Sequence, residues 1–269
     1  MNNTEQRIEN IKEAVDRSEF DVSVEPGDPV LSAEERKKIT EEHFAKRGSF
    51  SHKTKTFFAE RAADIITLFT QKNTEIINDC FGLPKGAIIT INHFSPLDST
   101  VVRKYLRKNG GDRLNIVARD KNFAMKGYIG FLMRYTRTIP LPEEPRQLAS
   151  LFTPEVERVL KDGEYLLIYP EAEMWQNYRK PRPLKIGAYH YAARFCAPVI
   201  PMFCEITEKD GKGGFRLYVG DAIFPDMTLD KRARAEKMRQ RDFEFKKAAY
   251  EKAYGKPLNY TFETDDIAF

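Results

Sequence analysis

Two residues in the stretch from Ile91 to Ser99 have types and a spacing suited to acid–base chemistry. The stretch reads Ile-Asn-His-Phe-Ser-Pro-Leu-Asp-Ser, and its titratable side chains are His93 and Asp98. An aspartate that accepts a hydrogen bond from Nδ1–H fixes the tautomer of a histidine and leaves Nε2 free to take a proton. The pair therefore predicts a general base with an orienting carboxylate. Because it includes no protein nucleophile, the substrate would supply the reacting hydroxyl.

Asp98 also has a purely structural interpretation. Ser95 at a helix N-cap and Asp98 three residues later would form a capping box, in which each side chain satisfies a backbone N–H of the other residue. A histidine and an aspartate at this spacing are a weak pattern when taken alone. The spacing leaves both interpretations open.

Two elements must position this stretch. Gly86 to Ile91 is an apolar, β-branched run, which is typical of a buried central strand. Leu97 to Lys108 predicts a helix, with Ser95 as its N-cap and Pro96 as its first residue. His93 would then lie on a strand-to-helix turn, at the edge of the sheet where α/β proteins place their chemistry.

Apolar runs alternate with helical patterns along the rest of the chain. This alternation predicts an α/β fold, with a mixed, mainly parallel sheet flanked by helices and an N-terminal helical arm. We expect the arm at residues 1–55, a catalytic domain at 56–225, and a C-terminal helix and tail at 226–269. The further strands are expected at 114–118, 138–142, 164–169, 199–203 and 215–219, and the further helices at 4–20, 32–46, 57–77, 146–161, 184–195 and 229–254.

The expected helix at residues 57–77 follows a polar break at 48–55 and has an apolar face. Phe58, Ile65 and Phe69 recur on it at helical spacing. We expect this face to pack against the sheet, and contact with a membrane is the alternative.

Composition indicates a globular protein, since 41% of the residues are hydrophobic and 12% are aromatic. No apolar run approaches the roughly 20 residues of a membrane span, and the polar N-terminus lacks a signal region, so we expect a cytoplasmic location. Cys80, Cys196 and Cys204 have no metal-binding or redox spacing, and we expect them to be reduced core residues.

Four segments resemble, in the same order, the blocks of the glycerolipid acyltransferase family, which includes the 1-acylglycerol-3-phosphate acyltransferases. The family blocks are Asn-His-x4-Asp, a glycine-to-arginine block, Phe-Pro-Glu-Gly-Thr-Arg, and an apolar strand around Val-Pro-x-x-Pro. The resemblance spans residues 85–222 and implies a glycerol-phosphate-acyltransferase-like fold. The matching segments here are Asn92 to Asp98, Gly127 to Arg137, Tyr169 to Glu171, and Ala197 to Pro201.

The resemblance implies that His93, oriented by Asp98, deprotonates the hydroxyl of a glycerophosphate or lysophospholipid acceptor. That hydroxyl attacks an acyl thioester, either acyl-CoA or acyl carrier protein, in a reaction that needs no cofactor, metal or enzyme nucleophile. An arginine of the second block would bind the acceptor, and Arg134 and Arg137 are the candidates. Glu171 is expected as a polar site residue or as the partner of one of these arginines. No Gly-x-Ser-x-Gly motif occurs, which disfavours a serine hydrolase.

The third block departs from the family pattern, because Glu171 is followed by Ala-Glu-Met in place of Gly-Thr-Arg. A basic loop stiffened by two prolines comes directly after it and carries Arg179, Lys180, Arg182 and Lys185. We predict that Arg179, Lys180 and Arg182 bind the anionic acceptor in place of the missing arginine. The alternative is a solvated surface loop.

The net charge of +4 is small, but cations gather on the helix expected at 229–254. Such a helix is a solvated face, a phospholipid-binding surface or a contact for an acidic acyl carrier protein. We expect peripheral, salt-sensitive association with the inner face of the cell membrane. We expect no nucleic acid partner, because no stacking-aromatic motif is present. Two other functions stay open: an acyltransferase for a non-glycerolipid acceptor, such as an aminolipid or envelope component, and a non-enzymatic module that binds anionic membranes.

Overall fold

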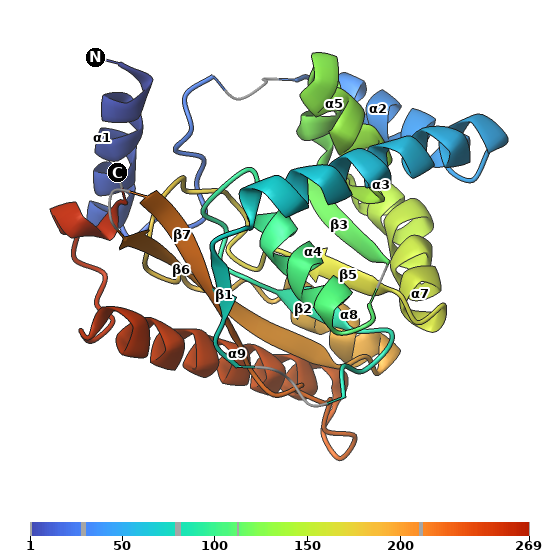
Figure 1. The fold of residues 1–269 in the computed structure, drawn as a ribbon. Helices are drawn as coiled ribbons and strands as arrows, with labels where there is room; N and C mark the ends of the chain where they lie inside the picture. The colour runs from blue at the N-terminus through green and yellow to red at the C-terminus, as the bar shows by residue number, and fades with distance from the viewer. Residues whose placement is uncertain (1, 28–30, 79–81, 112, 210–211, 269) are drawn as a thin grey trace.

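The computed structural model describes residues 2–27, 31–78, 82–111, 113–209 and 212–268. Within this part of the chain, a seven-stranded sheet in the order β1-β7-β6-β2-β5-β3-β4 forms the centre (Figure 1). Strands β6, β2, β5, β3 and β4 are parallel, β7 is antiparallel to β6, and β1 is parallel to β7. The strands are β1 (Thr74–Ile76), β2 (Ile88–Thr90), β3 (Leu114–Arg119), β4 (Thr138–Leu141), β5 (Tyr165–Ile168), β6 (Val199–Lys209) and β7 (Lys212–Val219).

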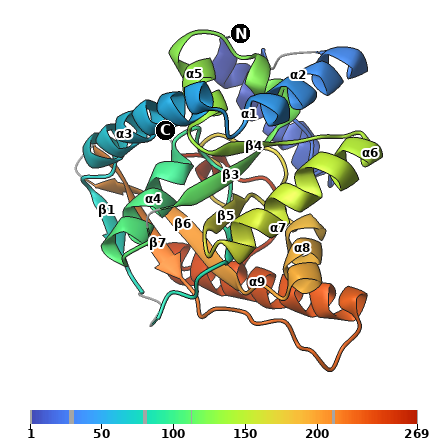
Figure 2. The same ribbon diagram turned by 90° about the vertical axis from the view of Figure 1, so that its right-hand side faces the viewer.

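Helices cover both faces of this sheet (Figure 2). One apolar core lies between the sheet and α4, and a second lies between the sheet and α7, α8 and α9. The predicted mixed, mainly parallel α/β fold with an N-terminal helical region is confirmed. The helices are α1 (Asn3–Asp16), α2 (Ala33–Lys46), α3 (Phe50–Thr70), α4 (Asp98–Lys108), α5 (Gly127–Tyr135), α6 (Pro145–Gln147), α7 (Thr153–Lys161), α8 (Gly187–Phe195) and α9 (Lys231–Tyr254), with 3₁₀ turns at Asp120–Ala124 and Thr264–Asp266 and a π turn at Leu148–Phe152.

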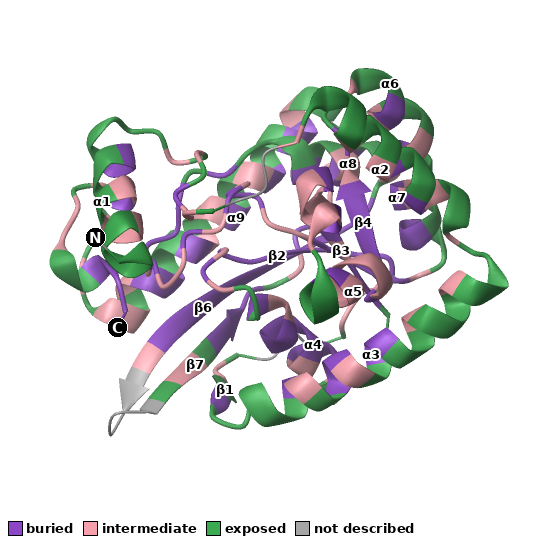
Figure 3. Cartoon of the chain, turned by 90° about the horizontal axis from the view of Figure 1, so that it is seen from above, coloured by how far each residue is buried: buried purple, intermediate pink, exposed green. Residues whose placement is uncertain are grey.

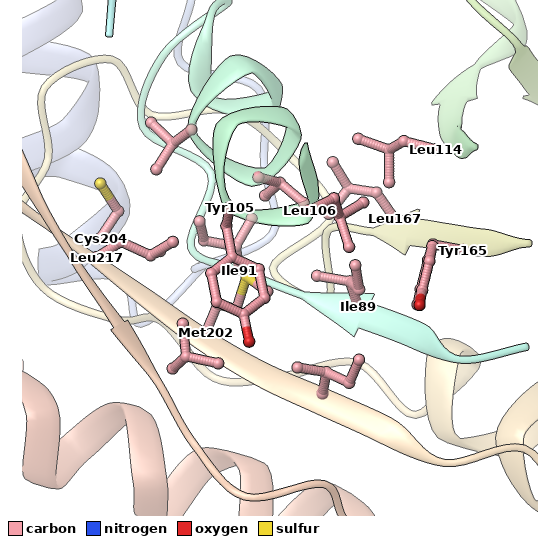
Figure 4. Close-up of a cluster of buried hydrophobic side chains, with 14 of the residues drawn as sticks. Ile89, Ile91, Tyr105, Leu106, Leu114, Tyr165, Leu167, Met202, Cys204 and Leu217 are labelled. Atoms are coloured by element: carbon pink, nitrogen blue, oxygen red, sulfur yellow. The ribbon is translucent and has the colours of Figure 1, made fainter. Parts of the chain in front are cut away.

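Strand β2 is central and fully buried, as its apolar, β-branched sequence predicts. It pairs with β5 on one side and β6 on the other, so that Ile89 lies opposite Leu167 and Ile200. Ile89 and Ile91 point into the core under α4, where they lie among the side chains drawn in Figure 4. The chain that leaves β2 is therefore fixed before it reaches residue 93.

The structure corrects the limits of the helix predicted at residues 57–77. Helix α3 extends back into the predicted polar break at 48–55, and strand β1 occupies the last part of the predicted helix. Helix α3 thus crosses residue 55, where the N-terminal arm was expected to end. The domain limits themselves stay a prediction.

The apolar face of α3 does not pack against the sheet, so that prediction is wrong. The helix lies at the periphery with exposed residues along its outer side (Figure 3). Its buried residues are small or polar, namely Ala59, Glu60, Ala63, Asp64 and Thr67. Its large apolar side chains have exposed fractions of 54–87% and form what we call the apolar stripe: Phe50, Phe57, Phe58, Ile65, Leu68 and Phe69.

Ion pairs attach the inner face of α3 to the rest of the protein. Glu60 pairs at 3.2 Å with Arg103 of α4 and at 3.2 Å with Arg137 before β4. Asp64 pairs at 3.0 Å with Arg107, also on α4. These carboxylates would be costly to bury without their partners, so the pairing explains why the helix turns its acidic side inward.

The N-terminal helix α1 packs through Ile11, Ala14 and Val15 against Trp175 and Ile267. No helix within the described residues is both long and apolar enough to cross a bilayer.

One cysteine differs from the sequence-based expectation. Cys204 is buried, as expected, but Cys196 is exposed at the left-handed C-terminal end of α8, so its assignment to the core is wrong. Cys80 lies outside the described residues.

Candidate active site

The turn after β2 is held by the loop that follows β5. The backbone N–H of His93 donates to Glu171 Oε2 at 3.1 Å, and the His93 carbonyl accepts from the Trp175 amide at 3.0 Å. The Phe94 carbonyl accepts from the Asn177 amide at 2.9 Å. Segments about 80 residues apart in the sequence thus fix the backbone that carries His93.

His93 and Asp98 are in direct contact. The distance from His93 Nδ1 to Asp98 Oδ2 is 2.7 Å, and Asp98 is 2% exposed. Asp98 is the first residue of α4, where the helix dipole favours a negative charge. The His93 side chain is 20% exposed, and no hydrogen bond from the described residues engages its Nε2. The imidazole therefore has one anchored nitrogen and one available nitrogen.

The capping-box interpretation of Asp98 describes only a minor part of its contacts. Leu97 is the N-cap of α4, so the prediction that Ser95 caps the helix is wrong. The Ser95 hydroxyl accepts from the Leu97 amide at 3.2 Å, and the Ser95 amide reaches Asp98 Oδ2 at a long 3.4 Å. The shorter contact of that same oxygen is with His93, because the carboxylate folds back over the turn.

Tyr169, which follows β5, completes this group and was not predicted as a site residue. Its hydroxyl donates to Asp98 Oδ1 at 2.5 Å, and its ring stacks on the His93 imidazole with centroids 3.8 Å apart and planes at 15°. Burial, followed by the nearby charge of Asp98, raises the pKa of Tyr169 well above its usual value, so the phenol stays a donor. The sequence carried one signal: this position follows a buried strand and holds tyrosine where the third block has phenylalanine.

Glu171 and Arg182 form a buried ion pair beside this turn. Their side chains are 2% and 1% exposed, and Arg182 Nη2 lies 2.9 Å from Glu171 Oε2. Arg182 also donates to the carbonyls of Phe20 and Glu173, and it stacks on Trp175. The partner of Glu171 is thus neither Arg134 nor Arg137, and Arg182, which was predicted to bind the acceptor, is buried in this ion pair.

Lys180 and Arg179 turn toward the C-terminal tail. Lys180, which was predicted to bind the acceptor, is fully buried and pairs with Asp266 Oδ2 at 2.7 Å. Arg179 is partly buried, donates to the Asp265 carbonyl at 2.8 Å, and lies over the ring of Tyr254. The basic loop is therefore neither a solvated loop nor a cluster of cations facing His93.

The two arginines of the second block are also engaged within the protein. Arg134 donates from Nη1 to the carbonyls of Phe123 and Met125, at 3.0 and 2.8 Å, and so fixes the turn before α5. Arg137 immediately precedes β4 and pairs with Glu60 and with Glu164, which precedes β5. In parallel strands that position is the amino edge of the sheet, opposite to His93. The structure therefore does not bring Arg137, a predicted acceptor contact, together with His93.

Arg119 is a cation at the carboxyl edge of the sheet, the edge that carries His93. It was not predicted from the sequence as a site residue. It is the last residue of β3, its side chain is 37% exposed, and its Nη1 lies 2.8 Å from Glu173 Oε1. Strand β5 alone separates β3 from β2, so the spacing of strands puts the ends of β2 and β3 about 10 Å apart. Its position at the end of a buried strand was the available signal.

The loop after Glu171 adopts a left-handed backbone conformation at Ala172. Ala172 has a φ of 72°, a left-handed conformation that costs a non-glycine residue about 1–2 kcal/mol. The family block has glycine at this position. The bonds of Glu171 to His93 and Arg182 hold the loop in place despite this strain.

One group of carboxylates in the described part of the chain could hold a metal ion. It consists of Glu263, Asp265 and Asp266, whose oxygens lie within 4.8 Å of one another. Lys256 and Lys180 already pair with these carboxylates. We therefore assign it to the attachment of the tail.

Comparison with known proteins bears on the family and on the fold. The Acyltransferase family model matches residues 69–205, slightly more than half of the 269-residue chain. No curated protein matches the chain significantly. Among solved structures, the 1-acyl-sn-glycerophosphate (LPA) acyltransferase PlsC from Thermotoga maritima is similar, with a TM-score of 0.53 and 15% identity over 96% of this chain and 98% of that chain. At this identity the likeness shows the fold alone.

Proposed function

Because the chain belongs to the acyltransferase family, we propose that it moves a fatty acyl group from a thioester to a hydroxyl of a lysophospholipid-type acceptor, with His93 as the general base. The observation that carries this proposal is the 2.7 Å contact between His93 Nδ1 and Asp98, together with a partly exposed imidazole. The donor is acyl-CoA or acyl carrier protein.

The proposed reaction uses the available Nε2 of His93, while Nδ1 stays bonded to Asp98. Nε2 of His93 accepts the proton of the acceptor hydroxyl as its oxygen attacks the thioester carbonyl. The carbon–sulfur bond then breaks, and the leaving thiolate takes the proton from Nε2, so the histidine returns to its neutral form. Asp98 accepts the hydrogen bond of Nδ1–H throughout and stabilises the transient imidazolium.

We further propose that Arg119 contacts an anionic group of the acceptor. The cations predicted for this role are engaged elsewhere, whereas Arg119 is partly exposed at the carboxyl edge of the sheet. An arginine can bind a phosphate through two N–H donors. Arg119 would present both donors once its ion pair with Glu173 breaks.

Because the predicted cations are paired within the protein, the structure also supports a second candidate acceptor. Glu173 is 8% exposed and balances Arg119, so the two charges together form a neutral pair. Such a pair also suits an acceptor without a phosphate, such as an aminolipid or envelope component.

The test is an acceptor screen with both thioester donors, read by thiol release and by mass spectrometry of the lipid product. Lysophosphatidate should be acylated, and Arg119→Gln should raise the KM for it by at least about tenfold, because a charge-assisted contact contributes about 1.5–3 kcal/mol. Arg113→Gln is the matched control, since Arg113 precedes the same strand at its other end and also pairs with a buried carboxylate, Glu164.

Three other results of the screen are informative. Transfer only to phosphate-free acceptors would select the second candidate. An equal effect of both substitutions would remove Arg119 from the site. Absence of thiol release with every donor and acceptor would leave the membrane-binding module as the function.

We also propose peripheral association with the inner face of the cell membrane through the apolar stripe of α3. Helix α5 packs against α3 and adds Tyr128 and Ile129, with exposed fractions of 58% and 64%. Leu97, the residue before Asp98, is 44% exposed. Apolar side chains next to exposed lysines such as Lys55 and Lys72 are typical of a helix that lies in a membrane interface.

Replacing Phe58, Ile65 and Phe69 with serine should weaken binding to anionic vesicles at least about tenfold, since each side chain would lose up to about 1.5–3 kcal/mol of burial. Vesicle flotation in low and high salt measures this. The sequence predicts salt-sensitive binding, and the apolar stripe adds a component that persists in high salt. The control replaces Phe224 and Met227, which are as exposed but lie elsewhere. An equal loss in both variants would contradict the assignment.

A further inference from the structure

Tyr169 contacts both His93 and Asp98, each with a different part of its side chain. Its hydroxyl donates to Asp98 Oδ1 at 2.5 Å, while His93 bonds the other oxygen, Oδ2, at 2.7 Å. Its ring lies flat against the imidazole, with centroids 3.8 Å apart. The carboxylate is thus held between two donors, and the imidazole is covered on one face by an aromatic ring.

We propose that Tyr169 is a positioning residue that sets the pH range in which His93 can act as a base. This inference rests on the proposed function. A carboxylate that accepts a hydrogen bond from a phenol shares its negative charge with that donor and attracts an imidazolium less strongly. The hydroxyl of Tyr169 therefore weakens the attraction of Asp98 for a protonated His93.

The ring of Tyr169 acts in the opposite direction. An aromatic face within about 6 Å of a cation stabilises that cation, so the stacked ring favours the protonated form of His93. The hydroxyl and the ring can be separated by substitution. Tyr169→Phe removes the hydroxyl alone, whereas Tyr169→Leu removes the hydroxyl and the aromatic face.

The other polar and ionisable groups around the pair belong to three elements. Glu171, in the loop after β5, accepts the His93 amide and is balanced by Arg182. Ser99 lies on α4 near the Tyr169 hydroxyl, and Cys204 lies on β6. Burial, and then the charges of Asp98 and Glu205, raise the pKa of the Cys204 thiol well above its usual value, so it stays neutral.

The test is a proton NMR titration of the His93 imidazole in the full chain. The chain has four histidines, so the His93 signal is identified by its loss in His93→Ala. In Tyr169→Phe, the midpoint should rise by about 0.5–1 pH unit, a fraction of the effect of a hydrogen bond to a charged group. In Tyr169→Leu it should lie below that of the phenylalanine variant.

Tyr189→Phe is the matched control. Its hydroxyl donates to the buried carboxylate of Asp242, which reproduces the phenol–carboxylate contact away from His93. The acidic limb of kcat/KM for acyl transfer should move with the NMR midpoint in both Tyr169 variants. An unchanged or lowered midpoint in Tyr169→Phe would overturn the inference. Absence of transfer by the unaltered protein would overturn the proposed function alone, because the titration needs no turnover.

Discussion

Replacing His93 with alanine should reduce acyl transfer by about 10²–10⁴-fold, the usual contribution of a general base, while the protein stays folded. The side chain is partly exposed, and its hydrogen bond is to Asp98 alone among the described residues. Asp98→Asn should cause a smaller but still large loss, because an amide no longer stabilises the imidazolium. Steady-state kinetics at saturating donor and acceptor, with thermal unfolding in parallel, measures both effects.

The control for this prediction is His190→Ala. His190 is exposed on α8 and has no carboxylate partner among the described residues, so its replacement should leave transfer unchanged. Near-normal turnover in His93→Ala would remove the proposed base. If Asp98→Asn mainly lowered the melting temperature and kept activity, the capping role of Asp98 would be its main one.

Arg182→Met should have the largest effect on stability. Removing one partner of a buried ion pair typically costs about 3–5 kcal/mol, because the other charge stays buried and unpaired. Glu171 would lose its cation, and the backbone N–H of His93 would lose a fixed acceptor. For a chain of this size we expect the melting temperature to fall by about 10 °C, measured by circular dichroism.

Two further variants separate stability from substrate binding. Arg179→Met removes a partly buried cation from the same loop and should lower the melting temperature much less. Adding Glu171→Gln to Arg182→Met should recover part of the loss, since it neutralises the orphaned charge. An unchanged melting temperature with a raised acceptor KM would restore the substrate-binding role predicted from the sequence.

The sequence was sufficient for the elements whose patterns are local. The buried strand before His93, the helix expected at 32–46, and the long helix that ends before Gly255 were all predicted close to where they lie. Periodicity and turn residues report on nearby backbone, so such features can be found without tertiary information.

The sequence was insufficient wherever a side chain meets a distant one. Arg182 looks like a solvent-facing cation until Glu171 and the carbonyl of Phe20 are placed against it, and Phe20 lies 162 residues away in the chain. The same holds for Arg137, whose partner Glu60 lies on α3. Charge patterns show that cations cluster, but only packing decides whether they face solvent, substrate or a carboxylate.

The prediction for the apolar face of α3 was wrong for a different reason. Its hydrophobic spacing was found correctly, but the spacing cannot say whether an apolar face meets a protein core or another apolar phase. The acidic residues on its other side, Glu60 and Asp64, were the informative ones, because they need arginine partners inside the protein.

The ion pairs between α3 and α4 would also set the height of the candidate active site above the lipid. These ion pairs join α3 to α4, whose first residue is Asp98, so an α3 bound in a membrane interface would determine the height of the His93–Asp98 pair (Figure 1). An interfacial helix sinks about 5–10 Å into the boundary between head groups and acyl chains. The imidazole would then stay at one depth as the protein diffuses along the bilayer. Acceptor hydroxyls at that depth would react in preference to hydroxyls deeper among the acyl chains or out in water.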